Sequence, residues 1–293
     1  MGKLIMIKKL LGIAPTLNSD GSFNPSPLAL KLATSSKTDY KETTFQSSYQ
    51  GSQSRIMMIC AEEKNLTMAN GTEFSTGNHP IEMLVPMLHL QNAGFHIDVF
   101  TPTGKSAKIE EWAMPAEDKN VMSLYAQYEE HFNHPKSLSE FVNQHINDSS
   151  DFTAIFIPGG HGAMNGLPEN QDLKKLIHWS FQKDLHMLAI CHGPAALLSA
   201  NLNQDGEFLY SGYSMAVFPD SMDKQTPMIG YMPGQLTYQF GSKLSELGVN
   251  IVNKKADKTC HQDRKLITGA SPQAANDFGI LSATALLQSK NIL

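Results

Sequence analysis

The chain has 293 residues, of which 41% are hydrophobic and 17% are charged, so it can bury a substantial core and does not resemble a disordered protein. Its formal net charge is −5 and it has no long basic run, which argues against nucleic acid as the main partner because phosphate binding needs clustered Lys and Arg. We therefore expect small-molecule chemistry and no sequence-specific binding of nucleic acid.

Cysteine usage and the N-terminal residues bear on the location of the protein. Cys60, Cys191 and Cys260 are too few and odd in number for a disulfide framework, which is typical of a reducing compartment, so we expect the cytoplasm. Residues 1–15 hold a short apolar stretch that two lysines interrupt, too short for a signal peptide or a membrane-spanning helix. We therefore expect no membrane anchor and no membrane partner.

The first part of the chain predicts an irregular arm followed by a strand, a helix and a second strand. Residues 14–54 are rich in Ser, Thr, Asn and Pro, whereas residues 55–60, RIMMIC, form the continuous apolar run of a parallel strand buried on both faces. Pro80 opens a helix that Gly94 ends, and residues 95–102 form the second strand. This order is the unit from which parallel sheets are built.

The rest of the chain continues the alternation after an insertion. Residues 104–150 are charged and break the rhythm, with a short helix expected at 134–146. Further strands are expected at 152–160, 185–191, 249–253 and 265–269, and further helices at 167–184, from 194 onward, at 235–248 and at 271–290, the last with Ser271 as its cap. The alternation predicts an α/β fold with a mostly parallel sheet.

Cys191 ends one of the predicted buried strands, and ligands of parallel sheets usually bind at that end. Residues 189–193, Ala-Ile-Cys-His-Gly, have the form of a nucleophile elbow, since small neighbours allow a tight turn that exposes the central side chain. The helix start that follows would stabilise a thiolate and lower the pKa of the thiol. A buried, unreactive thiol is the alternative.

The two other cysteines lack this setting. Cys260 and His261 repeat the dipeptide, but polar residues surround them, so nothing would expose or activate that thiol. Cys60 ends a buried strand without a tight glycine turn after it, which favours a core residue. The Cys-His dipeptide alone therefore carries no signal.

A cysteine that attacks a carbonyl also needs hydrogen-bond donors for the developing oxyanion. Gly159, Gly160 and Gly162 directly follow a predicted buried strand, so their backbone N–H groups can line the same crevice. A phosphate-binding loop is the weaker alternative, because no Lys-Ser/Thr follows and Asn165 takes the place of the last glycine of a G-x-G-x-x-G pattern.

Candidates for proton transfer lie near the same edge of the sheet. His192 adjoins the cysteine, and Asp220 follows an apolar stretch where it could orient a histidine, although a helix cap is the alternative. Glu82 lies in a first helical turn, where an apolar crevice would raise the pKa of its carboxyl and let it shuttle a proton. A favourable interaction with the helix dipole is the alternative for Glu82.

The eleven histidines form no recognisable metal motif. No HExxH is present, and His131 and His134 lie in a polar segment that favours solvated side chains. We therefore expect neither zinc nor another cofactor.

Several motifs together resemble the DJ-1/PfpI family, and within it the bacterial Hsp31-type group of glyoxalase III and protein deglycase. In chain order they are NGTEFSTGNHPIEM, EEWAMP, FIPGGHGAMNGLPE, LAICHGPAALLSA, GYSMAVFPDSMDKQTPMIGYMPGQLT and DRKLITGASPQAAN. The resemblance implies a flavodoxin-like core, like that of class I glutamine amidotransferases, at 55–293. It also implies a small second domain built from the arm at 1–54 and the insertion at 104–150, and a homodimer.

The resemblance also implies roles for single residues. The residues implied for catalysis are Cys191 as nucleophile, His192 and Asp220 as the rest of a triad, and Glu82 beside the thiol. Those implied for the oxyanion and the substrate are the backbone of Gly160 and His192, with His161 and His79 lining the pocket. Some members bind a metal through a His, Glu, His set whose positions fall on Gln91, His96 and Tyr128, so we expect this metal site to be lost.

The activity implied is conversion of methylglyoxal to D-lactate without glutathione, together with hydrolysis of early glycation adducts on proteins and nucleotides. Both begin with addition of one thiol to a carbonyl, and neither needs a cofactor. The alternative is a stress-induced holding chaperone that binds unfolded proteins and whose cysteine is incidental or redox-sensing. Amidase or peptidase chemistry of the wider superfamily ranks last, because the small domain would obstruct a peptide pocket.

Overall fold

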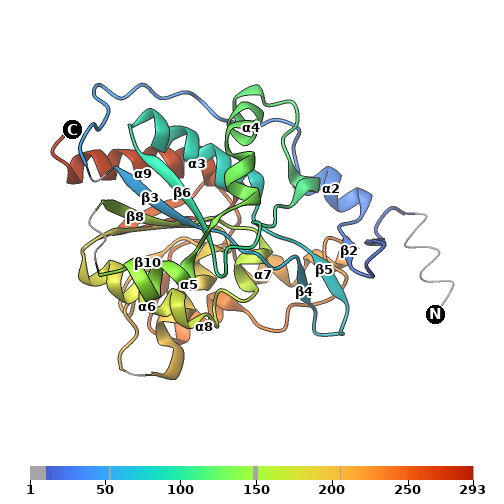
Figure 1. Ribbon diagram of the computed structural model, residues 1–293. Helices are drawn as coiled ribbons and strands as arrows, with labels where there is room; N and C mark the ends of the chain where they lie inside the picture. The colour runs from blue at the N-terminus through green and yellow to red at the C-terminus, as the bar shows by residue number, and fades with distance from the viewer. Residues whose placement is uncertain (1–10, 53, 148–150, 205, 293) are drawn as a thin grey trace.

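A seven-stranded sheet forms the centre of the computed structural model, which describes residues 11–52, 54–147, 151–204 and 206–292 (Figure 1). Across the sheet the strands are β12 (Cys260–Asp263), β13 (Leu266–Gly269), β9 (His186–Ile190), β8 (Phe152–Ile157), β3 (Arg55–Ile59), β6 (His96–Thr101) and β7 (Lys136–Ser137). All neighbours pair in parallel except β12 and β13. The predicted α/β class with a mostly parallel sheet is confirmed.

Helices cover both faces of this sheet and give the molecule three layers (Figure 1). On one face α3 (Pro80–Asn92) and α9 (Ala275–Ser289) lie side by side, and α4 (Lys119–Asn133) packs against α3. On the other face lie α6 (Gln171–Gln182) and α8 (Phe240–Glu246). These layers leave the carboxyl ends of the parallel strands uncovered, and this edge is where ligands of such sheets usually bind.

Strand β3 shows why its sequence is apolar throughout. Side chains alternate along a strand, so Ile56 and Met58 join the core under α3 and α9, whereas Met57 and Ile59 join the core under α6. All of these side chains are fully buried. A strand covered on both faces has no position for a polar side chain, which is the pattern predicted for residues 55–60.

The predicted ends of two helices also follow local signals. Pro80 occupies the first turn of α3, and Gly94, with φ of +92°, lies just beyond its last residue. The Ser271 side chain accepts a hydrogen bond from the Gln273 backbone N–H ahead of α9. These predictions are confirmed.

Three predicted elements differ in the structure. The segment after Cys191 is a 3₁₀ helix over Gly193–Gln204, narrower than an α-helix, and it breaks where Asn203 adopts φ of +68°. The strand expected at 249–253 is reduced to β11 (Asn250–Ile251), which pairs with β10 (Ser214–Met215) outside the large sheet. The short helix expected at 134–146 begins with β7 instead and continues as α5 (Leu138–Glu140) and a π-helical turn.

A second, four-stranded sheet lies beside the carboxyl edge of the large one (Figure 1). Its strands, in order, are β1 (Thr16–Leu17), β2 (Phe23–Asn24), β5 (Glu73–Ser75) and β4 (Asn65–Thr67), and the arm adds α2 (Pro27–Ala33). The insertion at 104–150 divides between the two sheets. Trp112 packs against Phe74 of β5, whereas α4 packs on α3 and β7 extends the large sheet.

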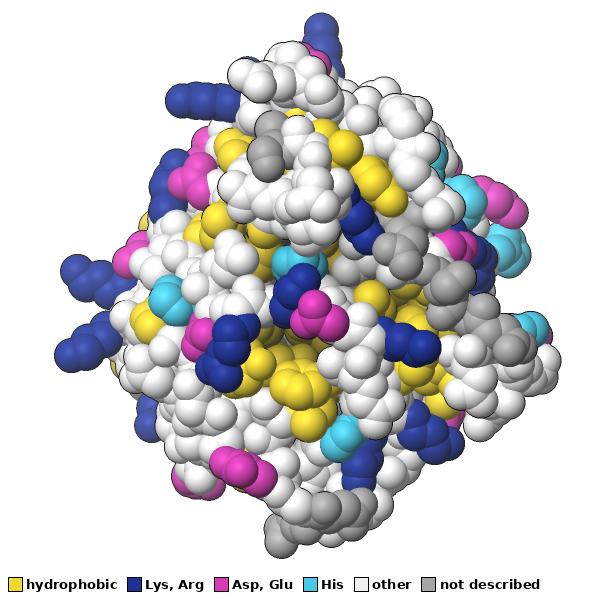
Figure 2. Space-filling view, turned by 90° about the vertical axis from the view of Figure 1, so that its left-hand side faces the viewer, with side chains coloured by type: hydrophobic (Ala, Val, Ile, Leu, Met, Phe, Trp, Pro, Cys, Tyr) yellow, Lys and Arg dark blue, Asp and Glu magenta, His cyan; other side chains and the backbone are white. Residues whose placement is uncertain are grey.

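The surface carries mixed charge on the face that lies at the left of Figure 1. Figure 2 shows hydrophobic side chains there in separate groups, with Lys and Arg spread among acidic side chains. Within the described part of the chain, no helix combines the length and the apolar character that crossing a membrane requires. The prediction that the N-terminus holds no membrane anchor concerns mainly residues 1–10, which lie outside the described residues.

We predict that Gly193→Ala destabilises the fold, because a Cβ at this position would lie 2.4 Å from the carbonyl oxygen of Ile157 in β8. The backbone of a central strand cannot yield, so the free energy of unfolding is expected to fall by about 1–3 kcal/mol. Urea denaturation measures this change. Gly234→Ala is the control, because the three atoms nearest to its Cβ belong to the exposed Asn70 side chain, which can move. Equal losses in the two variants would contradict the prediction.

Candidate active site

Cys191 lies at the carboxyl end of β9 in a backbone conformation that side chains rarely adopt. Its φ is +61°, and its backbone is fixed on both sides. The Cys191 N–H donates to the Gly269 carbonyl at 2.7 Å, and the Cys191 carbonyl accepts from the Phe218 N–H at 2.9 Å. The predicted tight turn after the strand is therefore present. The backbone contacts hold Cys191 in place, and the residue is only 3% exposed.

His192 lies between the thiol and a carboxylate. Its Nδ1 is 3.3 Å from Cys191 Sγ, and its Nε2 is 2.9 Å from Oδ2 of Asp223 in the short helix α7 (Asp220–Asp223). An ionised carboxylate only accepts hydrogen bonds, so Nε2 carries a hydrogen and Nδ1 is left to accept a proton from the thiol. The three side chains form a Cys–His–Asp arrangement of the kind used in nucleophilic catalysis.

The acid of this arrangement is not the residue that the sequence predicted. Asp220 Oδ1 accepts from the Gly241 N–H at 3.0 Å, and its Oδ2 accepts from the Ser242 N–H at 2.8 Å, so Asp220 caps α8 and makes no described contact with a histidine. Asp223, three residues further along α7, points inward and is 3% exposed. The assignment of Asp220 as the partner of His192 is wrong. The stretch FPDSMD offers both carboxylates, and the second was not considered.

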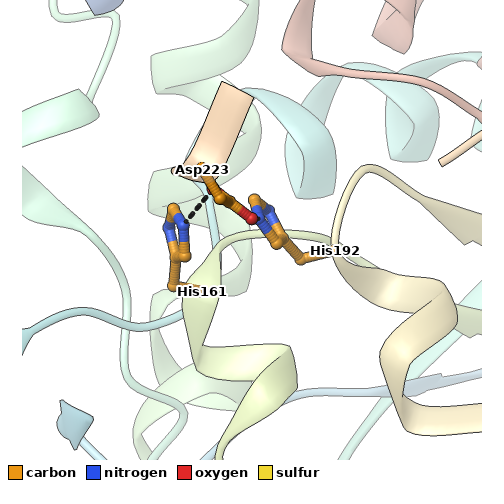
Figure 3. Close-up of side chains that lie close together, drawn as sticks. All are labelled: His161, His192 and Asp223. Carbon is orange, nitrogen blue, oxygen red and sulfur yellow. Dashed lines mark hydrogen bonds and ion pairs between the residues drawn. The ribbon is translucent and has the colours of Figure 1, made fainter. Parts of the chain in front are cut away.

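Asp223 also binds a second histidine. His161 Nε2 is 3.0 Å from Asp223 Oδ1, and the rings of His161 and His192 are 4.0 Å apart between centroids (Figure 3). His161 opens the 3₁₀ turn His161–Met164 after β8, in the predicted glycine segment. In Figure 3 the two rings lie close together at the carboxylate of Asp223, so one carboxylate serves two imidazoles.

The charges of this buried cluster oppose one another. Burial alone would raise the pKa of Asp223, but the two histidines outweigh it and hold the pKa well below its usual range. Burial would lower the pKa of His161, but Asp223 and Glu110 raise it on balance. Burial and the neighbouring His161 lower the pKa of His192, which favours the neutral ring that a base requires.

Glu82 lies beside the thiol, as the sequence suggested. A Cβ on Gly159 would lie 2.1 Å from Glu82 Oε2 and 2.7 Å from Cys191 Cβ, so the carboxyl and the cysteine flank this glycine. Glu82 is fully buried in the first turn of α3. Neither of its carboxyl oxygens has a described hydrogen-bond partner of ordinary geometry. The Cys191 thiol and the Gly160 N–H nevertheless lie close to the carboxyl.

The protonation of Glu82 and that of Cys191 are linked. Burial, and to a smaller extent Glu110, raises the pKa of Glu82 well above its usual value. Burial and the Glu82 carboxyl likewise raise the pKa of Cys191, which runs against the lowering expected from the helix start alone. A thiolate is therefore favoured only when Glu82 is protonated and donates its hydrogen to the sulfur.

Two of the predicted oxyanion donors lie near the thiol and the Glu82 carboxyl. The His192 N–H lies near Cys191 Sγ and the Gly160 N–H near the Glu82 carboxyl, whereas the Gly162 N–H is already bonded to the Gly77 carbonyl at 3.0 Å. His79 is buried next to His161 and His192, and burial lowers its pKa to about 3, so its ring is neutral.

Two groups at the site escaped the sequence analysis. One is Glu110, a buried carboxyl near the start of the insertion at 104–150. The other is an aromatic cover made of Phe74, Trp112 and Tyr231, whose rings pack on one another, with Phe74 and Tyr231 also against His161. The residues come from three distant segments and no short motif unites them, so only the folded chain brings them together.

The comparisons with known proteins agree with this geometry. Residues 74–208 match the model of the DJ-1/PfpI family. A protein/nucleic acid deglycase HchA from Pseudomonas aeruginosa (strain UCBPP-PA14) is 43% identical over 92% of this chain and 92% of its own length. Protein/nucleic acid deglycase 1 from Escherichia coli (strain K12) is 45% identical over 92% of this chain and 93% of its own length. The chain belongs to the DJ-1/PfpI family.

Solved structures support the same fold. A crystal structure of glyoxalase III from Candida albicans has a TM-score of 0.60 and 22% identity, and it covers 79% of this chain and 98% of its own. The Francisella tularensis Rapid Encystment Protein has a TM-score of 0.65 at 22% identity, over 79% and 98% of the two chains. At this identity both show the DJ-1/PfpI fold alone.

The positions of the DJ-1/PfpI metal set do not fit a metal here. An amide, Gln91, and a phenol, Tyr128, occupy two of the three metal-ligand positions. They hydrogen-bond to each other, with Gln91 Nε2 donating to the Tyr128 hydroxyl at 2.9 Å. Burial raises the pKa of Tyr128, which disfavours the phenolate that a metal would need. His96 is exposed and is the one ordinary ligand type of the three.

His131 and His134 stay outside any metal cluster in the described ranges. The exposed His134 side chain lies 3.6 Å from Glu130, measured from Nε2 to Oε1. The described side chains bring three candidate ligand atoms within 4.8 Å of one another only at His161, His192 and Asp223, where the carboxylate already bonds both rings. These contacts make this cluster a hydrogen-bond network.

We predict that Asp220→Ala destabilises the protein because it removes the cap of α8. The loss of two backbone partners at a helix start is expected to lower the free energy of unfolding by about 1–2 kcal/mol. Urea denaturation measures this value, with Ser221→Ala, an exposed neighbour, as the control. Unchanged stability in Asp220→Ala would show that the cap contributes nothing.

Proposed function

We propose that this chain is a cysteine-dependent enzyme that converts methylglyoxal to D-lactate without glutathione and hydrolyses early glycation adducts on proteins and nucleotides. The observation that carries the proposal is the placement of Cys191 between His192 and Glu82, with Asp223 behind the histidine. The two relatives at 43% and 45% identity, both named protein/nucleic acid deglycases, support the second activity.

The first step is addition of the sulfur to the aldehyde. His192 Nδ1, 3.3 Å from Sγ, takes the thiol proton, and the sulfur bonds to the aldehyde carbon of methylglyoxal. Protonated Glu82 gives its hydrogen to the new alkoxide, which yields a hemithioacetal. Asp223 holds the His192 ring in place and stabilises the imidazolium that forms.

The second step moves hydrogen within the bound substrate. The Glu82 carboxylate, now ionised, removes the hydrogen from the former aldehyde carbon and returns it to the adjacent carbon. The hydroxyl proton passes between the two oxygens through Glu82 and His192, so a lactoyl thioester forms with no oxidant or reductant. Water then attacks the thioester with the Glu82 carboxylate as base, and the His192 imidazolium gives its proton to the leaving sulfur. These transfers release lactic acid and restore the thiol, the neutral His192 ring and the protonated Glu82.

The enclosure of the site suits a small α-oxoaldehyde. Cys191 is 3% exposed and His192 is 2% exposed, and the aromatic cover excludes bulk water from the thioester. A low-polarity setting strengthens the contacts of Asp223 with its histidines. A glycated side chain is larger, so the deglycase activity requires the cover to move aside.

We propose that the protein acts in the cytoplasm and without a cofactor. Cys60, Cys191 and Cys260 are free thiols, which suits the cytoplasm. The chemistry draws on side chains of this chain and on no cofactor. We also propose that the protein forms a homodimer. A stress-induced holding chaperone for unfolded proteins remains the alternative to the enzymatic function.

We predict that the purified protein forms D-lactate from methylglyoxal without glutathione and that Cys191→Ser lowers kcat/KM by about 1000-fold or more, because an alcohol in this setting is a far weaker nucleophile. Enzymatic detection of D-lactate measures the rate, after dialysis against a chelator. Cys260→Ser is the matched control and keeps full activity.

Two other results would contradict this assignment. Equal rates for the wild type and Cys191→Ser would exclude the thiol as nucleophile. Suppression of client aggregation by Cys191→Ser, with no turnover of methylglyoxal or of glycated peptide by the wild type, would favour the holding chaperone.

We predict that Asp223→Asn and Asp220→Asn separate in activity. Asp223→Asn removes the anion that orients His192 and is expected to lower kcat by about 100-fold or more, with a smaller effect on KM. Asp220→Asn affects the α8 cap and leaves kcat within about twofold, as expected for a residue away from the reacting atoms. The reverse order of the two variants would restore Asp220 as the acid.

A further inference from the structure

Glu110 is a buried carboxyl for which the mechanism above has no use. It is 1% exposed and follows a bridge between Asn78 and Ile109. The Thr76 hydroxyl donates to its Oε1 at 2.6 Å, but Oε2 is buried without a described hydrogen-bond partner of ordinary geometry. An acid in such a place is costly unless a nearby charge compensates it.

His161 is the group near Glu110 that can supply this charge. The backbone N–H groups of Gly77 and His161 lie near the Glu110 carboxyl, and a positive charge on the His161 ring favours its ionised form. Glu82 and Tyr231 are the other titratable groups that face Glu110, and neither supplies a positive charge. Glu110 and Asp223 therefore both act on the charge of one imidazole.

The two histidines at Asp223 are otherwise alike. Each places Nε2 on a separate oxygen of Asp223, at 3.0 Å for His161 and 2.9 Å for His192, and both rings are almost fully buried. With centroids 4.0 Å apart, two imidazolium ions would repel strongly, so the pair holds one positive charge while Cys191 is a neutral thiol. A second proton reaches the pair only together with the negative charge that forms on the sulfur. Asp223 by itself does not select which ring carries it, and buried His79 is neutral.

We propose that Glu110 is a positioning residue that holds the proton of the histidine pair on His161 and so leaves His192 neutral to accept the proton of Cys191. Glu110 touches no reacting atom and acts through His161. The effect on the charge of the rings stands by itself, and only the consequence for turnover rests on the proposed function.

The electrostatics of the cluster agree with this role. Burial raises the pKa of Glu110 to about 7, and His161 opposes the rise, so the carboxylate and the imidazolium stabilise each other. The pKa of His161 is raised and that of His192 is lowered, which is the asymmetry that the proposal requires. The anion at Glu110 also disfavours ionisation of Glu82, which keeps that carboxyl a hydrogen-bond donor.

We predict that Glu110→Gln lowers the pKa of His161 by about one unit or more, because the variant removes a buried negative charge next to the ring. Its amide oxygen still accepts from Thr76, so the contact that holds the segment remains. Nitrogen NMR of the histidine rings at pH 8, where Glu110 is ionised, measures the charge of each ring, with signals assigned through His161→Asn and His192→Asn.

The expected spectrum of the wild type has a cationic His161 and a neutral His192. Glu110→Asp keeps the anion and is expected to restore most of the His161 shift, whereas Glu111→Gln, which changes the exposed neighbour, leaves both rings as in the wild type. In the activity arm, Glu110→Gln is expected to lower kcat/KM for methylglyoxal about 5–20-fold, with the loss concentrated in kcat.

Two outcomes would overturn the proposal: a neutral His161 in the wild type at pH 8, or the same His161 pKa in Glu110→Gln. If Glu110→Gln fails to fold, Thr76→Val serves instead. It removes the donor that favours the ionised carboxyl, so the pKa of His161 is expected to fall near neutral pH by a smaller amount, and an unchanged value would reject the proposal. The NMR result does not depend on turnover, so an inactive wild type would reject the proposed function and leave this test intact.

Discussion

The packing around the turn at Cys191 sets the geometry on which the rest of the site depends. A side chain at φ of +61° is strained by about 1–2 kcal/mol, so the surrounding contacts have to impose the conformation. The Gly269 carbonyl and the Phe218 N–H hold the backbone from two sides. Gly159 and Gly193 leave no room for a Cβ, so strand β8 and the turn lie in direct backbone contact. The sulfur cannot withdraw from Glu82 or His192, and the reacting groups are positioned before any substrate arrives.

The second requirement is that the buried charges balance. Six titratable side chains are buried at the site besides the thiol and Tyr231: Glu82, Glu110, Asp223, His79, His161 and His192. In a setting with so little water, an isolated charge would be neutralised by a change of its own protonation. The arrangement Glu110, His161, Asp223, His192 places cation between anions and leaves one neutral ring beside the thiol. Glu82 remains a proton donor in the same field. The function proposed for Cys191 thus depends on side chains that never touch the sulfur.

Much of the fold could be predicted because its signals are local. A strand covered on both faces has no polar positions, which made residues 55–60 recognisable, and Pro80, Gly94 and Ser271 mark helix ends through backbone chemistry alone. The elbow around Cys191 was found for the same reason, since small residues at 189 and 193 are a condition of the turn itself. The 3₁₀ helix after it and the division of the insertion between two sheets were not predictable, because both depend on what packs against those segments.

The amino-acid sequence by itself determined the α/β class, the position of Cys191 at a tight turn after a buried strand, and the presence of Glu82 and His192 at one edge of the sheet. The tertiary structure decided which carboxylate serves the histidine. Asp220 and Asp223 lie within one turn of α7, and their sequence settings differ little. The start of α8 needs a partner for its free N–H groups and takes Asp220, which turns Asp223 inward to two rings. The tertiary structure also decides that Glu110 interacts with His161. Residues 110 and 161 come together only when the sheet has formed, so local sequence patterns cannot predict this interaction.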